Sequence, residues 1–332
     1  MILLTGATGL LGSHIAYELL QQGKKIRALK RKDSNSVLTE KIFSFYTNEH
    51  IELLNAIEWV EGDVLDLGSL EDAMVGITHV YHCAAMVSFL PKERDKMMQV
   101  NIEGTANVVN TAMHAGVKKL CHISSIAALG STIDGNMITE GTWWKNNPSN
   151  SYYAISKYGA EREVWRAAEE GLNVVIVNPS FIIGPGDTSK SSSEAFGILR
   201  KGASWYTNGV NGYVDVRDVA HAAIKLIESD VLNQRFILNA ANLSYRSFFD
   251  KVLVQLNKPK TKREAGKFLL ALAWRIEKLL AAIAGRNPII TKEKVGYALQ
   301  ISQYDGSKIQ KTINFNYRNI DTSIMEICKF YK

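Results

Sequence analysis

The sequence contains few cysteines and no long uninterrupted apolar run. Its 332 residues include three widely spaced cysteines, Cys83, Cys121 and Cys328. Their odd number and their spacing predict neither a disulfide framework nor a metal site, and we expect a cytoplasmic protein. The longest apolar stretch, Phe268–Ala284, is interrupted by charged residues and is too short to span a membrane. A first strand that begins at Met1 leaves no room for a signal peptide.

Acidic residues do not balance the basic ones. The chain has 39 Lys and Arg against 33 Asp and Glu, a net charge of +6. Part of the excess lies in two clusters, Lys24–Lys32 and Lys258–Lys267. No nucleic-acid-binding motif accompanies either cluster, so we do not expect a nucleic acid partner. The sequence also lacks repeats and low-complexity tracts, which favours a globular chain of one large or two interleaved domains.

A glycine-rich turn follows the first predicted strand, Ile2–Leu4. Gly6, Gly9 and Gly12 have the spacing G-x-x-G-x-x-G. Gly6 allows a sharp turn, Gly9 lets backbone N–H groups approach a pyrophosphate, and Gly12 lets the next helix pack closely on the sheet. The N-terminus of that helix, Leu10–Gln22, offers unpaired N–H donors to phosphate. This order of elements predicts a dinucleotide site, whose further contacts would be Thr8, Leu10 and Leu11.

Strand-like runs alternate with helical patterns up to Pro179. The strands are expected at Ile2–Leu4, Ile26–Leu29, Ile57–Val60, His79–His82, Lys119–Ile123 and Val174–Val177. The helices are expected at Leu10–Gln22, Val37–Tyr46, Ser69–Val75, Met97–Ala115 and Tyr152–Glu170. This alternation predicts an α/β fold with a Rossmann-type, doubly wound parallel sheet. We expect residues 1–180 to form the dinucleotide-binding domain, with 213–240 returning to it. Residues 181–212 and 241–332 would form a smaller, mostly C-terminal substrate-binding part.

The second strand lacks the carboxylate that holds the ribose of NAD in many dinucleotide folds. Lys30, Arg31 and Lys32 stand at its end, and the first acid is Asp33. Cations at this position accommodate the 2′-phosphate of NADP. The sequence therefore favours NADP(H), with NAD(H) as the other cofactor and a solvated basic edge as the plain structural alternative.

Residues after the third and fourth strands extend the predicted cofactor site. Asp63, next to Val64, can accept a hydrogen bond from the adenine amino group, although a turn aspartate is an almost equally good interpretation. Cys83, Ala84 and Ala85 are small enough for a dinucleotide to lie across the carboxyl edge of the sheet.

Tyr153 and Lys157 are four residues apart and so share one face of a predicted helix. A free tyrosine has a pKa of about 10, and a neighbouring ammonium lowers it toward the range of acid–base catalysis. Ser125, at the end of the fifth strand, can hydrogen-bond a substrate oxygen. The Y-x-x-x-K spacing also occurs by chance on exposed helices, and its position after a glycine turn and a strand-ending Ser-Ser favours catalysis.

Together these residues resemble the extended branch of the short-chain dehydrogenase/reductases, the NAD-dependent epimerase/dehydratase family. The closest similarity is to its dihydroflavonol-reductase-like and 3β-hydroxysteroid-dehydrogenase-like members. It extends from Met1 to about Ala240 and includes the segments 100–105, 178–185 and 213–220. The resemblance implies that Ser125, Tyr153 and Lys157 are catalytic and that Asn101 orders the site. It also implies a homodimer formed through the helices 97–115 and 152–170, and a nicotinamide beside Pro179, Ile182 and Ile183.

The chain also departs from relatives in the family. Ile126 and Ala127 stand where sugar dehydratases carry an acidic pair, and Ala127 stands where sugar epimerases often have a hydroxyl residue. Many relatives have arginine at the position of Asn178, which affects the expected cofactor contacts there. Dehydratase chemistry is therefore disfavoured and epimerase chemistry is weakened.

Three functions fit the sequence. The first is an NADP(H)-dependent oxidoreductase that interconverts a ketone and a secondary alcohol. The second is a nucleotide-sugar epimerase, for which Arg200, Lys201 and Arg217 are candidate diphosphate ligands. The third is a cofactor-binding regulator without turnover, which would not need an intact Ser-Tyr-Lys set.

Apolar and aromatic residues flank the expected substrate pocket, which suits a bulky, weakly polar ketone. The predicted substrate contacts are Met86, Ser88, Trp143 and Phe181, and Val87, Phe89 and Trp144 lie beside them. An amphipathic helix at Phe268–Ile283 follows the second basic cluster. We expect it to dock on the substrate-binding part, and the alternative is that it rests on an anionic membrane surface.

Overall fold

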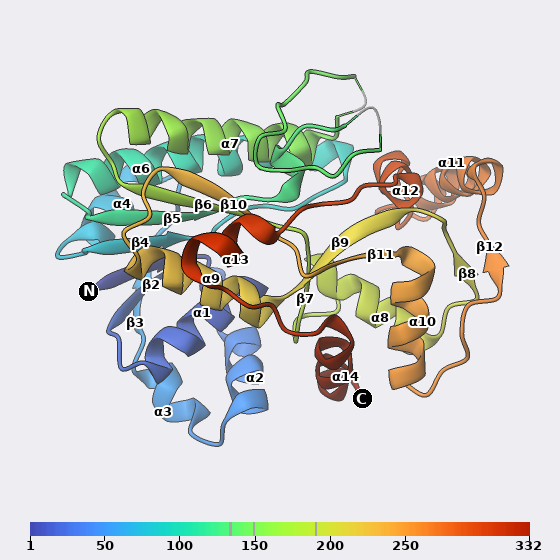
Figure 1. Ribbon diagram of the computed structural model, residues 1–332, viewed down its shortest axis with the longest axis horizontal. Coiled ribbons are helices and arrows are strands. Elements are labelled where there is room, and N and C mark those ends of the chain that lie inside the picture. The colour runs from blue at the N-terminus through green and yellow to red at the C-terminus, as the bar shows by residue number, and fades with distance from the viewer. Residues whose placement is uncertain (133–134, 149, 190) are drawn as a thin grey trace.

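The computed structural model describes residues 1–132, 135–148, 150–189 and 191–332. Its central sheet has seven parallel strands in the order β10-β6-β5-β4-β1-β2-β3 (Figure 1). The strand order reverses between β1 and β4, which creates the switch point where this class of sheet binds dinucleotides. These strands are β1 Ile2–Thr5, β2 Ile26–Lys30, β3 Glu58–Glu61, β4 His79–His82, β5 Lys119–Ile123, β6 Val174–Pro179 and β10 Gln234–Leu238.

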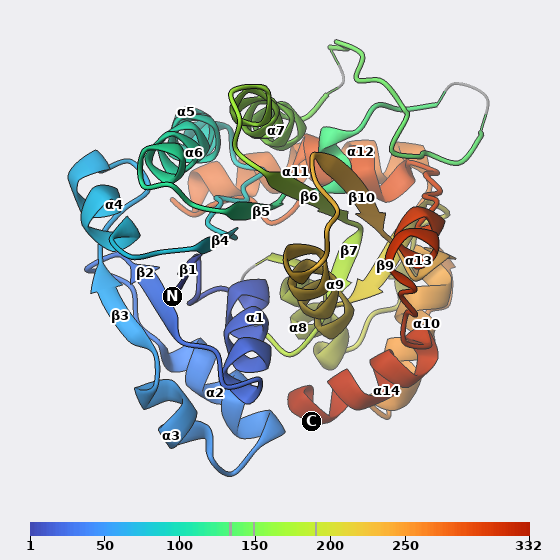
Figure 2. The ribbon, with the colours of Figure 1, turned by 60° about the vertical axis from the view of Figure 1, so that its left-hand side comes forward.

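Helices cover both faces of the sheet, which confirms the doubly wound α/β fold (Figure 2). On one face they bury an apolar core with β1, β5 and β6, and they are α1 Leu10–Gln21, α2 Val37–Tyr46, α3 His50–Asn55 and α9 Val216–Glu228. On the other face lie α4 Leu67–Met74, α6 Gly104–His114 and α7 Tyr152–Glu169. The buried strands are mostly apolar, as expected for a parallel sheet covered on both sides, but they also bury polar side chains such as His82, Lys119 and His122.

The predicted helix Met97–Ala115 is interrupted. It consists of α5 Arg94–Met98, a π-helical turn η2 Gln99–Glu103, and α6. A π-turn of this kind inserts one residue into the helix and is frequent at functional sites. Short 3₁₀ turns lie at Pro91–Glu93, Ile126–Ala128 and Ser191–Ser193.

A second lobe contains a three-stranded sheet of β7 Phe181–Ile183, β9 Val210–Asp215 and β11 Ala241–Ser244. Its core packs between the helices α8 Glu194–Lys201, α10 Tyr245–Gln255 and α14 Ile320–Tyr331. At its outer edge β8 Trp205–Tyr206 pairs with β12 Arg263–Glu264, followed by α11 Lys267–Ile283 and α12 Lys292–Leu299.

Two segments lie in a different lobe from the one the sequence suggested. Strand β9, expected to return to the central sheet, pairs with β7 and β11 instead. Conversely, helix α13 Ser307–Ile313 lies against β10, and Ile309 and Phe315 join the core of the central sheet. Hydrophobic alternation identifies buried positions and cannot say which of two adjacent sheets receives them.

Candidate active site

The glycine-rich turn brings α1 into direct contact with the sheet. Gly6 has a φ of 72°, and a Cβ there would lie 2.7 Å from the backbone nitrogen of Ala84. A Cβ on Gly12 would collide with the carbonyl oxygen of Gly6. Both positions therefore require glycine, because any side chain would push the helix and the strand end apart.

The N-terminus of α1 has the features of a phosphate site. Gly9 is its N-cap, and no side chain in the described part of the chain caps it. A Cβ at Gly186 would lie 3.0 Å from Cδ1 of Leu10, so the segment after β7 packs against the first residue of the helix. Uncapped N–H groups and a positive helix end suit a pyrophosphate, so the residues present fit a dinucleotide.

The end of β2 presents two cations in different environments. Lys30 places its ammonium 5.4 Å from the ring centre of Trp59 on the neighbouring strand β3. Arg31 is exposed, and its Nε lies 3.5 Å from Asp33 Oδ1, which is itself exposed. An exposed pair of this kind contributes little free energy. Arg31 can therefore leave Asp33 and bind a 2′-phosphate with little loss of free energy.

Asp63 and Val64 occupy the loop between β3 and α4. The Oδ1 of Asp63 accepts a hydrogen bond from the Leu65 N–H at 3.0 Å, which is the geometry of a turn aspartate. Val64 is buried and packs where a side chain on Gly104 would stand.

Beyond β4, burial raises the pKa of the Cys83 thiol well above its ordinary value. Cys83 is therefore a neutral wall residue and not a nucleophile.

Tyr153 lies in the first turn of α7, and Ser125 directly follows β5. The two side chains are hydrogen-bonded to one another. The Ser125 Oγ accepts a hydrogen bond from the Ala127 N–H at 3.1 Å. Helix α7 begins here because the Ser151 hydroxyl accepts a hydrogen bond from the Ala154 N–H.

The structure corrects the expected pKa of Tyr153. Burial raises the pKa of Tyr153 above its ordinary value, and the hydrogen bond with Ser125 lowers it only in part. The reason is the position of Lys157, whose Nζ donates to the Ile123 carbonyl at 2.8 Å. In this arrangement burial favours the protonated form of Tyr153 near neutral pH.

Lys157 is almost completely buried. Burial lowers its pKa to about 8, although the negative charge of Glu161, one turn later on α7, raises it. A lysine with such a pKa is partly neutral under physiological conditions, so small changes around it alter its charge.

Asn101 lies in the π-turn η2 and is buried. Its Oδ1 accepts the Met86 N–H at 2.7 Å, and its Nδ2 donates to the Met86 carbonyl at 2.9 Å and to Ser156 Oγ at 2.9 Å. The Ser156 hydroxyl in turn donates to the Tyr153 carbonyl. Asn101 therefore joins the segment after β4 to the helix that carries Tyr153 and Lys157.

A buried chain of hydrogen bonds connects the cofactor turn with Asn101. The Ala84 N–H donates to Thr5 Oγ1 at 3.1 Å, and Thr5 lies 2.8 Å from His82 Nδ1. His82 Nε2 lies 3.0 Å from Thr105 Oγ1, and the Thr105 hydroxyl donates to the Asn101 carbonyl at 2.6 Å. Because the Thr105 proton goes to that carbonyl, His82 must donate from Nε2 and accept at Nδ1. Burial lowers the pKa of His82 to about 3, so the ring is neutral.

The predicted substrate contacts have different environments. Met86 is held by Asn101, and the Ser88 hydroxyl donates to Glu93 Oε2 at 2.6 Å. Phe181 packs edge-on against Tyr213 in the core of the second lobe. Trp143 is 85% exposed, while its neighbour Trp144 stacks on Tyr158 on the outer side of α7.

Sequence reasoning missed Tyr297 on α12. Its ring centre lies 5.7 Å from that of Phe89, which in turn lies 6.0 Å from that of Tyr153. The Tyr297 hydroxyl is 2.7 Å from Ser151 Oγ, at the N-cap of α7. No motif marks Tyr297, because only the fold brings the C-terminal part of the chain to the active site.

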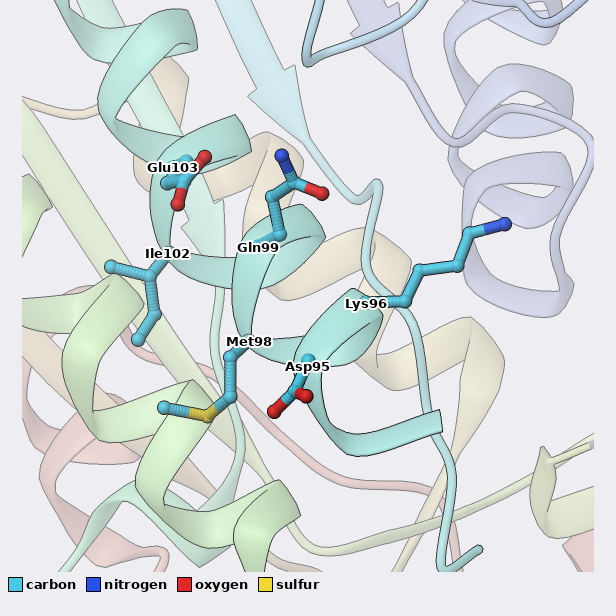
Figure 3. A pocket seen from close by; sticks show the side chains of 6 residues that line it. All are labelled: Asp95, Lys96, Met98, Gln99, Ile102 and Glu103. Carbon is cyan, nitrogen blue, oxygen red and sulfur yellow. The ribbon is translucent and has the colours of Figure 1, made fainter. Parts of the chain in front are cut away.

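A hollow of about 660 Å³ lies on the outer face of α5 and η2 (Figure 3). Met98 and Ile102 point from this face toward α7. The hollow lies on the helices through which the family resemblance implies dimerisation.

In the described ranges, no group of three or more His, Cys, Asp or Glu side chains could hold a metal ion.

Comparison with known proteins agrees with this geometry. Residues 2–241 match the model of the NAD dependent epimerase/dehydratase family. The chain belongs to this family. It is accordingly an NAD(P)-dependent enzyme of the extended short-chain dehydrogenase/reductase type, and the family model ends close to the last strand of the central sheet.

Three curated relatives are similar to this family member. A putative dihydroflavonol 4-reductase of Synechocystis is 30% identical and covers 99% of this chain and 93% of its own length. The sterol demethylase protein B of Methylococcus capsulatus is 31% identical, with coverage of 71% and 68%. A cinnamoyl-CoA reductase 1 of Petunia hybrida is 30% identical, with coverage of 71% and 72%.

Solved structures share the fold over the whole chain. The protein named gox2253 has a TM-score of 0.81 at 27% identity and covers 100% of this chain and 97% of its own. A UDP-glucose 4-epimerase of Thermotoga maritima, solved with UDP-glucose, has a TM-score of 0.77 at 18% identity, with coverage of 99% and 98%. The likeness to the epimerase is one of fold alone.

Proposed function

We propose that the protein is an NADP(H)-dependent reductase that converts a weakly polar ketone or aldehyde to the alcohol. The observation that carries the proposal is the hydrogen-bonded pair of Ser125 and a protonated Tyr153 beside buried Lys157. A protonated tyrosine can give its proton to a carbonyl oxygen that is becoming an alkoxide. The nicotinamide would supply the hydride when bound, and the chain supplies position and the proton.

Each residue has a distinct role in this proposal. Ser125 orients the substrate oxygen through its hydroxyl, and Tyr153 donates the proton to that oxygen. Lys157 contributes positive charge near the site in its protonated form. Asn101 does not touch the substrate in this scheme, because its amide is used by Met86 and Ser156. Asn101 fixes the position of the segment after β4 relative to α7, the helix that carries Tyr153 and Lys157.

The aromatic side chains next to Tyr153 and the names of the relatives support an apolar carbonyl substrate. Phe89 and Tyr297 form an aromatic row that ends at Tyr153. The names of two relatives describe reductases, of a dihydroflavonol and of a cinnamoyl thioester, and a third name refers to a sterol. Epimerisation of a nucleotide sugar has less support, because Arg217, one of the predicted diphosphate ligands, is paired with Asp215 and Glu326.

The experiment is a screen of purified protein with NADPH and with NADH against aromatic and alicyclic ketones, aldehydes and thioesters. UDP-sugars are tested in parallel for epimerisation. We expect oxidation of NADPH with carbonyl substrates and a fall of about a hundredfold or more in kcat for Tyr153→Phe. Tyr152→Phe, one residue earlier, is the matched control and should keep its activity. Turnover of UDP-sugars without carbonyl reduction, or an active Tyr153→Phe variant, would refute the proposal.

A further inference from the structure

The helix α11 exposes its apolar face instead of burying it. Phe268 is 86% exposed and Ile283 is 75% exposed, at opposite ends of the helix. Only Ala281 is buried among the residues of this helix. The helix packs on α12, within the C-terminal part of the chain, but its apolar stripe stays exposed. The exposed stripe consists of Phe268, Leu269, Leu272, Ile276, Leu279, Leu280 and Ile283.

These seven side chains form one continuous surface. At about 100° per residue they fall within an arc of about 120° on the helix. Lys267, Arg275 and Lys278 lie along one border of that arc and are exposed. The acid in this helix, Glu277, lies on the other side and is paired with Arg286, whose Nη1 is 2.6 Å from Glu277 Oε1. No anionic side chain of α11 therefore opposes the exposed surface.

The positive charge of the whole protein is concentrated in the same region. Residues 258–294 contain ten Lys and Arg against three Glu, a net charge of +7. The rest of the chain has 29 basic and 30 acidic residues. An exposed apolar stripe with three exposed cations along its border, in the segment that carries the chain's excess of positive charge, is complementary to an anionic lipid surface, where apolar side chains enter the interface and cations meet headgroups.

We propose that the protein binds anionic membranes through α11, which lies flat in the interface with its seven-residue stripe among the lipid chains. Figure 1 shows α11 at the edge of the molecule, beside α12 and away from the central sheet. None of the helices in the described ranges is long and apolar enough to cross a membrane, so the contact is peripheral. Membrane binding goes beyond the proposed reductase activity and does not depend on it, whereas the substrate class inferred from it rests on that activity.

The position of α11 connects this surface with the active site. Helix α12 packs on α11 and carries Tyr297. Tyr297 begins the aromatic row that passes through Phe89 to Tyr153. Docking through α11 therefore holds α12, and with it one wall of the substrate site, close to the lipid. A carbonyl compound dissolved in the membrane is the substrate class that this arrangement suits.

The test is co-sedimentation of the full chain with vesicles, which needs no substrate. Vesicles of phosphatidylcholine alone are compared with vesicles that also contain phosphatidylglycerol, at low and at physiological ionic strength. We expect binding to the anionic vesicles that weakens as salt is added. Leu272→Ser/Leu279→Ser should reduce partitioning by about tenfold or more. Lys267→Gln/Arg275→Gln/Lys278→Gln should reduce it by roughly fivefold for each charge.

The matched control is Val75→Ser/Leu232→Ser, which removes two exposed apolar side chains far from α11 in the sequence and should bind like the unchanged protein. Circular dichroism and NADPH binding confirm that each variant is folded. Three results would overturn the proposal: no binding to anionic vesicles, equal binding by the stripe variant, or an oligomer that the stripe variant dissociates. The last result would mean that a second copy of the chain covers α11.

Discussion

Arg235 on β10 donates from Nη1 to Glu161 Oε1 on α7 at a distance of 2.9 Å. Glu161 is almost completely buried, and its Oε2 also accepts hydrogen bonds from Ser124 Oγ at 2.7 Å and from Asn178 Nδ2 at 2.8 Å. The same Asn178 amide donates to the Ser125 carbonyl at 3.0 Å. A single buried carboxylate thus holds the backbone on which Ser125 stands, and Arg235 supplies its counter-charge.

Removing Arg235 should therefore destabilise the protein by leaving Glu161 charged and unpaired. We expect Arg235→Ala to lower the free energy of unfolding by about 3 kcal/mol, the lower end for a broken buried ion pair because Arg235 is partly exposed. Urea denaturation measures the change, and Arg162→Ala, at an exposed arginine of the same helix α7, is the control.

A second substitution makes this prediction specific. The family resemblance implies arginine in many relatives at the position of Asn178, which lies in β6, the strand next to β10. Asn178→Arg in the Arg235→Ala background should place a guanidinium near Glu161 again and restore part of the lost stability. If Arg235→Ala unfolds at the same urea concentration as the unchanged protein, the pair does not stabilise the fold.

The departure at Asn178 shows what sequence reasoning can and cannot predict. The glycine turn, the alternation of strands and helices, and the placement of Ser125 at a strand end and of Tyr153 and Lys157 on one helix could be predicted, because each depends on residues close together in the chain. The ion pair of Arg235 with Glu161 could not, because it needs the pairing of β10 with β6. The hydrogen-bond chain through His82 could not be predicted either, because it needs the pairing of β1 with β4.

The C-terminal part of the chain was the least predictable. The helix that periodicity predicts at Phe268–Ile283 is present as α11, Lys267–Ile283. Periodicity gives the face of a helix that is apolar but does not say whether anything covers that face. Tyr297 likewise belongs to no motif. Its contact with Phe89 depends on the position of α12 in the fold.

The pH dependence of carbonyl reduction should reflect the loss of a proton from Lys157. Its pKa of about 8 means that the ammonium is present below that pH and is lost as the pH rises through it. If the charged form is required, kcat/KM for reduction falls above a pH of about 8. Tyr153 does not produce this limb, because burial keeps its pKa above its ordinary value.

Glu161→Gln tests whether Lys157 is the group that titrates in this limb. The negative charge of Glu161 raises the pKa of Lys157, so its removal should move the falling limb to lower pH. Glu163→Gln, at a partly exposed position on the same helix, should leave the limb in place. A profile that is flat up to a pH of about 9, or a limb that Glu161→Gln does not move, would exclude Lys157 as its source.

Cofactor preference should depend on Arg31. We expect NADPH to bind more tightly than NADH, and Arg31→Ala to remove most of that preference. A charge-assisted hydrogen bond to phosphate contributes about 1.5–3 kcal/mol, or about ten- to a hundredfold in affinity. Asp33→Asn removes the acid that lies 3.5 Å from Arg31 and should strengthen NADPH binding slightly. Fluorescence titration with both cofactors tests this, with Lys32→Ala as the control. Equal affinities for the two cofactors would contradict the prediction.

Dimerisation should occur through the face of α5, η2, α6 and α7 that bears the hollow in Figure 3. Met98 is partly exposed at this face, and a charge there would be desolvated in an interface between two copies. We expect the unchanged protein to be a dimer by light scattering and Met98→Glu to be a folded monomer with unchanged NADPH affinity. Met325→Glu introduces the same charge at an exposed methionine on α14 and should remain dimeric. A monomeric unchanged protein, or a dimer that survives Met98→Glu, would show that this face does not hold the subunits together.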